Sequence, residues 1–156
     1  MGLESTAAIA EILGAIAVVI SLVYLSIQIR AQNKEARIAS VHEILEAYRN
    51  QIMVLNNNEF AELYLKGISN FDSLNDAEAL RFMSALQGLF RVWEEAYYQW
   101  INGRLDEHYW QGINRLSIDL LATDGGLRAW ELRSYAYSKD FVLYLSNQQP
   151  GEYAIR

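Results

Sequence analysis

The sequence predicts an all-α protein in which an N-terminal transmembrane helix continues into a cytoplasmic helical bundle. Three observations lead to this fold class. An uncharged, almost wholly apolar run lies near the start of the chain, and the apolar residues beyond it recur at helical spacing. The chain also has a single proline and no alternating, β-branched stretch that would indicate a strand. Its 156 residues suffice for one compact domain with a short appendage.

The apolar run extends from Ile12 to Ile29, between the charged residues Glu11 and Arg30. As a helix, it would extend over roughly 27 Å, close to the hydrocarbon thickness of a bilayer, about 30 Å. We therefore expect a membrane span over residues 7–29. Glu11 is interpreted as a charge at the boundary of the span that reaches the headgroups.

Three alternatives to a membrane span stay open. A cleaved signal peptide would begin with basic residues and end with small ones, whereas this chain begins MGLEST and its apolar run ends LVYLSIQIR. A buried helix of a soluble protein would rarely be apolar on every face. The start also fits an N-myristoylation pattern, with Gly2 and Thr6 at the required positions.

Flanking charge predicts the orientation of the span. No Lys or Arg precedes it, whereas Arg30, Lys34 and Arg37 follow it. Because positive residues are retained in the cytoplasm, we expect residues 1–6 outside and the C-terminal part inside. This gives an extracytoplasmic N-terminus (1–6), a transmembrane helix (7–29), a cytoplasmic helical bundle (30–147) and a flexible tail (148–156).

Small residues of the span lie on one side of the predicted helix. They alternate spacings of three and four, and two polar residues continue the same line. The members of this small-residue seam are Ala7, Ala10, Gly14, Ala17, Ser21, Tyr24 and Gln28. Small side chains let membrane helices approach closely, so the seam predicts a homo-oligomer. The alternative is that the seam arises by chance, because Ala and Gly are common in membrane helices.

The remaining helices follow from periodicity and capping residues. The first helix should continue to about Asn56, and a short one should cover residues 59–66 and stop at Gly67. Asn75 and Glu78 form a capping-box pattern for a helix over 76–102 that Gly103 closes. The later elements are a helix capped by Asp106 and reaching residue 121, a turn at 124–126, and helices over 127–137 and 140–145, the last capped by Asp140.

Charge and composition exclude several classes. The chain carries 13 basic and 19 acidic residues, a net charge of −6, which argues against a nucleic-acid-binding surface. The absence of cysteine rules out disulfides, thiolate metal sites and a cysteine nucleophile.

Three stretches of the chain are distinctive: the run EILGAIAVVISLVYLSIQIRAQNKEAR, with its YLxxQIR-like end, and the later FAELYLKGISNFDSLNDAEALRF and FRVWEEAYYQWINGRLDEHYW. They carry a resemblance to a widespread family of uncharacterised bacterial single-pass membrane proteins. The resemblance covers nearly the whole chain and implies a location in the bacterial inner membrane. It implies no activity.

The sequence contains no catalytic, phosphate-binding or metal-binding motif, so no catalytic, cofactor or metal residue is predicted. His42 and His108 are expected to be partly buried, hydrogen-bonded helix residues. A buried polar cluster of Arg91, Glu94 and His108 is the one candidate for acid–base chemistry. A structural pairing of Glu94 with Arg or a Tyr hydroxyl is favoured over that chemistry.

These observations predict a membrane-anchored, self-associating helical protein, an interaction scaffold or accessory subunit. Its partners would be itself, membrane lipid and another membrane or cytoplasmic protein, with no nucleic acid and no cofactor. The main alternative is a homo-oligomeric ion-conducting pore with one helix per subunit. A membrane-bound enzyme is the third hypothesis.

Overall fold

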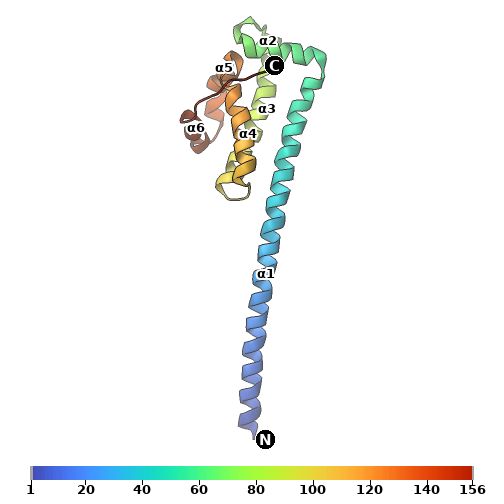
Figure 1. The fold of residues 1–156 in the computed structure, drawn as a ribbon, viewed down its shortest axis with the longest axis vertical. Helices are drawn as coiled ribbons and strands as arrows, with labels where there is room; N and C mark the ends of the chain where they lie inside the picture. Colours follow the sequence, from blue (N-terminus) through green and yellow to red (C-terminus); the bar gives the residue numbers. More distant parts are fainter. Residues whose placement is uncertain (1, 156) are drawn as a thin grey trace. The chain divides into compact units, whose positions relative to one another are not determined.

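The computed structural model describes residues 2–155 and, for residues 3–7, only the backbone. This part of the chain is helical and contains no strand, which confirms the all-α class and the long apolar N-terminal helix that continues into helical segments (Figure 1). The α-helices are α1 (Leu3–Ile52), α2 (Asn58–Ser69), α3 (Asp76–Ile101), α4 (Glu107–Leu120), α5 (Asp124–Arg133) and α6 (Lys139–Ser146). Short 3₁₀ turns lie between α1 and α2 (η1, Met53–Asn56), between α2 and α3 (η2, Phe71–Ser73) and between α5 and α6 (η3, Ser134–Ala136).

The chain forms two units, the first ending at Ile38 and the second beginning at Ala39. The first unit consists of the N-terminal part of α1. Every side chain described between Ala8 and Ile38 is exposed, including the large aliphatic ones. This unit therefore has no core of its own.

The second unit is built around α3. Its buried stripe consists of Phe82, Leu86, Phe90, Trp93 and Ala96, spaced three or four residues apart as one face of a helix requires. The other helices close over this stripe with Trp110 from α4, Ala129 from α5 and Phe141 from α6. Edge-to-face packing of the Trp93 and Phe141 rings, at 5.3 Å between centroids, is typical of such an aromatic core.

The last turns of α1 belong to the second unit. Ser40 and Ile44 are buried, and Ile44 and Ala47 line a hollow together with Val92 of α3. One turn farther along, the Gln51 side chain covers Gly88. These contacts pair the end of α1 with α3 in antiparallel register.

The predicted ends of α3 are confirmed to within one residue, whereas α1 ends at Ile52 and not at about Asn56. Asn75 and Glu78 form the reciprocal capping box that begins α3. Gly103, which follows the end of α3, has a φ of 67°, a left-handed conformation that glycine adopts without strain. The predicted stop at Gly67 is wrong, because α2 continues to Ser69 and Gly67 packs inside it against the Phe82 ring.

Two further predictions at the C-terminal end are wrong. Residues 124–126 are the first turn of α5 and not a separate turn, because the Thr123 hydroxyl accepts a hydrogen bond from the Gly126 amide at 3.0 Å and caps the helix. The last helix begins after Ser138, which places Asp140 in its first turn instead of at the N-cap.

The tail beyond α6 has no regular secondary structure up to Ile155, but two contacts attach it to the helices. The Gly151 amide donates a hydrogen bond to Asp119 Oδ1 at 3.0 Å. The hydroxyls of Tyr153 and Tyr64 lie 3.2 Å apart.

Candidate functional site

The small-residue seam lies on the exposed part of α1. Ala7 falls among the residues whose side chains are not described; the other members, from Ala10 to Gln28, are all exposed. At Gly14 nothing lies within 4 Å of the position that a Cβ would occupy. The described part of the chain therefore leaves this helix face uncovered.

Polar side chains in the seam form hydrogen bonds within α1. The Ser21 hydroxyl donates to the Ala17 carbonyl at 2.8 Å, and Gln28 Nε2 donates to the Tyr24 hydroxyl at 2.8 Å. A bilayer offers no water to satisfy polar groups, so such internal pairing lowers the cost of placing these residues in lipid.

The structure brings Arg91 and Glu94 together on α3. One carboxylate oxygen of Glu94 accepts a hydrogen bond from Arg91 Nη1 at 2.7 Å, and the other accepts one from the Ser138 amide at 2.6 Å. Arg91 Nη2 donates in turn to the Ala136 carbonyl at 2.9 Å. The pair thus fixes the connection between η3 and α6 onto α3, a geometry that favours a structural role.

Tyr137 completes this arrangement. The Arg91 guanidinium carbon lies 4.4 Å from the centroid of the Tyr137 ring, a cation–π contact. Burial raises the pKa of Tyr137 to about 12, and the nearby Arg91 charge only partly offsets that effect. The phenol is therefore neutral at physiological pH.

Neither histidine joins the Arg91–Glu94 pair. His108 lies on α4 and lines a different hollow, and His42 lies on α1. The expectation that both histidines are partly buried is wrong, because both side chains are exposed. Both histidines lie on the outward sides of their helices. The spacing of apolar residues around them does not indicate whether a histidine at these positions is buried or exposed.

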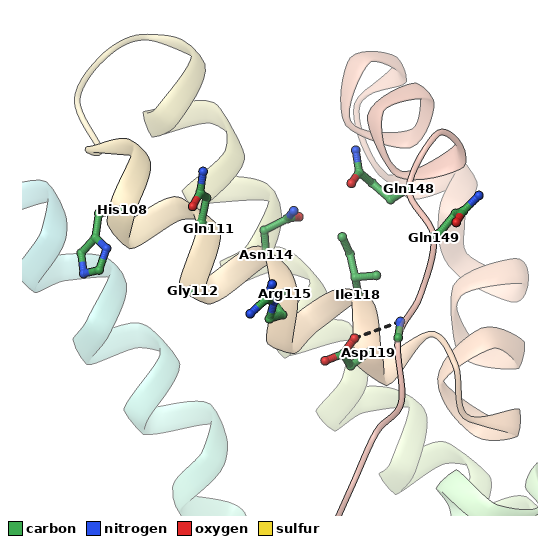
Figure 2. A pocket seen from close by; sticks show the side chains of 10 residues that line it. His108, Gln111, Gly112, Asn114, Arg115, Ile118, Asp119, Gln148 and Gln149 are labelled. Atoms are coloured by element: carbon green, nitrogen blue, oxygen red, sulfur yellow. Dashed lines mark hydrogen bonds between the residues drawn. The ribbon is translucent and has the colours of Figure 1, made fainter.

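A polar hollow of about 560 Å³ lies between α4 and the tail (Figure 2). On the helix side it is lined by successive polar residues, among them Gln111, Arg115 and Asp119. On the tail side it is lined by Gln148 and Gln149, and the hydrogen bond from Gly151 to Asp119 closes one end (Figure 2).

This hollow is not predicted by the sequence, because the polar residues 148–156 indicate a flexible tail. The available signal was the row of polar residues at helical spacing on α4, Gln111, Arg115 and Asp119. Among the side chains that the structure describes, no group of three or more His, Cys, Asp or Glu residues is placed to hold a metal ion.

Comparison with protein-family models, with curated proteins and with solved structures finds no match to this chain.

Proposed function

We propose that the protein is a membrane-anchored, self-associating helical protein whose C-terminal unit serves as an interaction or accessory domain in the bacterial cytoplasm. The observation that carries this proposal is the exposure of the apolar part of α1. Its most apolar 18-residue stretch has no buried residue, and Ile12, Val19 and Leu22 are each 60% exposed.

Such a surface is unfavourable in water. Burial of one large aliphatic side chain contributes about 1.5–3 kcal/mol, and this helix leaves more than one such side chain uncovered in every turn. Exposed apolar patches of this extent are typical of membrane or protein contacts. The length of the stretch matches a bilayer, and its polar side chains form hydrogen bonds within the helix.

Self-association is supported by the open face at Gly14. Because nothing in the described part of the chain covers this position, a neighbouring helix can approach its backbone closely. The same face does not favour the pore alternative, since Ser21 and Gln28 direct their hydrogen bonds within the helix and so add little to a water-filled path.

The membrane location and orientation can be tested by single-cysteine labelling, because the chain has no cysteine of its own. We expect the protein to stay in bacterial membranes after an alkaline carbonate wash. A membrane-impermeant maleimide should label Ser5→Cys in intact spheroplasts and Ser146→Cys only after lysis. Release by the wash would contradict membrane anchoring, and the reverse labelling pattern would contradict the orientation.

A further inference from the structure

Two side chains of opposite charge on α4, Arg115 and Asp119, line the hollow without forming an ion pair with each other. Arg115 and Asp119 are four residues apart, the spacing at which helical side chains commonly form ion pairs. Within the described part of the chain, no ion pair joins them and no hydrogen bond engages the Arg115 guanidinium. Both residues line the hollow.

The tail holds Asp119 in place. Its Oδ1 accepts the hydrogen bond from the Gly151 amide, while its other carboxylate oxygen has no partner among the described residues. A Cβ on Gly151 would lie 2.6 Å from Asp119 Oδ1, so this close approach of the tail depends on glycine. The Asp119 carboxylate is therefore fixed on one side and available on the other.

The rest of the lining narrows the class of ligand. It contains no Trp, Tyr or Phe, the larger rings on which nucleobases stack, and its one ring, the His108 imidazole, is exposed. Ile118 is its one aliphatic side chain, too few for an apolar ligand. The amides of Gln148 and Gln149 supply further hydrogen-bond donors and acceptors, and Gln111 adds its amide oxygen, since its Nε2 already donates to Glu107 Oε1 at 2.9 Å.

We propose that this hollow binds a small zwitterion, a molecule that carries a carboxylate or phosphate close to an ammonium group. The Arg115 guanidinium pairs with the anionic group, and the free oxygen of Asp119 accepts from the ammonium. The glutamine amides bind a polar remainder. An amino acid and a phosphoethanolamine headgroup share this chemistry.

The probes are L-glutamine and O-phosphoethanolamine, titrated into the full-length protein in detergent micelles and followed by saturation-transfer NMR and calorimetry. Glutaramate lacks the ammonium group of L-glutamine, and 4-aminobutanamide lacks its carboxylate. Each analogue should bind at least about ten-fold more weakly than L-glutamine, the loss expected for one charge-assisted hydrogen bond. Tighter binding of L-glutamine assigns the site to a soluble amino acid, and tighter binding of O-phosphoethanolamine assigns it to a lipid headgroup.

Substitutions of Arg115 and Asp119 test whether these two side chains bind the zwitterion. Arg115→Gln and Asp119→Asn should each weaken zwitterion binding by about ten-fold or more, and Asp119→Asn should also abolish the preference for L-glutamine over glutaramate. Asparagine retains an oxygen that accepts from Gly151. Arg104→Gln, an exposed cation outside the hollow, is the matched control and should bind as the parent does.

The proposal is overturned if neither zwitterion binds, if glutaramate binds as tightly as L-glutamine, or if Arg115→Gln binds as the parent does. Should Asp119→Asn lower the melting temperature, the Arg115→Gln result decides, because that side chain is exposed and unpaired within the described residues. None of these measurements depends on membrane orientation or self-association.

Discussion

Gly125 in the first turn of α5 lies directly against the carbonyl oxygen of Gly67 in α2, with no space for a side chain between them. A Cβ on Gly125 would also lie 2.9 Å from the Phe82 ring, and one on Gly67 would lie 2.5 Å from it. The two helices thus meet at their backbones, above one of the most deeply buried rings of the second unit.

Gly125→Ala should therefore destabilise the second unit. The added methyl group would force α5 away from α2, and such overpacking typically costs about 1–3 kcal/mol. Urea unfolding followed by tryptophan fluorescence measures this unit, since all four tryptophans lie in it. Gly112→Ala is the control, because its Cβ would meet nothing within 4 Å and a helical alanine should be neutral or stabilising. Equal stability of Gly125→Ala and the parent would contradict the contact.

The Arg91–Glu94 pair predicts a structural effect at Glu94. Glu94→Gln retains an oxygen for the Ser138 amide but loses the charge that Arg91 pairs with, so we expect a loss of about 1–2 kcal/mol in the free energy of unfolding. The side chain of Glu94 is 17% exposed and that of Arg91 is 49% exposed, so solvent screens the carboxylate less than the guanidinium.

The chain contains a matched control for this substitution. Arg128 and Glu131 have the same spacing, but their side chains are about half exposed and 3.5 Å apart. Glu131→Gln should change stability by less than about 0.5 kcal/mol. If the two substitutions have the same effect on urea unfolding and thermal stability, the structural role of Glu94 is wrong.

The buried phenols predict a loss of stability at alkaline pH. The pKa of Tyr137 is about 12 in the folded chain against an ordinary value of 10, so folding favours the protonated phenol. The stabilisation of the folded chain by the protonated Tyr137 phenol is complete below pH 10 and is lost as the pH rises from 10 to about 12. Burial also raises the pKa of Tyr64 and Tyr144.

Tyr137→Phe should make the decline in stability above pH 10 shallower, with little effect at neutral pH, because its hydroxyl makes one long hydrogen bond of 3.4 Å to the Gln87 carbonyl. Ultraviolet titration of tyrosinate, with urea unfolding at each pH, measures both effects. An unchanged alkaline profile in this variant would refute the assignment to Tyr137.

The lowered pKa of Glu78 predicts that stability falls at acid pH, the opposite direction to that of Tyr137. The hydrogen bond of Glu78 with Lys66, at 2.6 Å, and that from the Asn75 amide lower the pKa of its carboxyl below the ordinary 4.5. The charged form is favoured by folding, so its contribution is present above pH 4.5 and is lost as the pH falls through the lowered pKa. In Glu78→Gln, stability should decline less steeply below pH 4.5, as measured by urea unfolding. A decline as steep as that of the parent would count against this role.

The helices of this fold could be predicted because local sequence determines them. The capping box at Asn75 and the left-handed glycine at position 103 act within one turn of chain. Residues 124–126 could not be assigned correctly from sequence, because two adjacent glycines usually indicate a turn. Here they form a helix, stabilised by the Thr123 cap and packed closely on Gly67.

The two candidate sites differ in how far apart in the sequence their contacting residues lie. Arg91 and Glu94 are three residues apart, so their pairing was visible in the helical spacing. The contact between Asp119 and Gly151 joins residues 32 positions apart, and no local pattern predicts it. The polar hollow beside it could therefore not be recognised from the sequence.

We propose that the apolar part of α1 associates with copies of itself within a membrane. Single cysteines at Ala10, Gly14 and Ala17, and at Ile9, Ile16 and Ile20 on the bulky side, allow disulfide cross-linking in carbonate-washed bacterial membranes. We predict strong dimer formation at the first three positions, weak formation at the other three, and loss of cross-linking at Ala17→Cys when Gly14 is also changed to Leu, but not when Val23 is. Equal cross-linking on both sides, or none at any position, would contradict association through the small-residue seam.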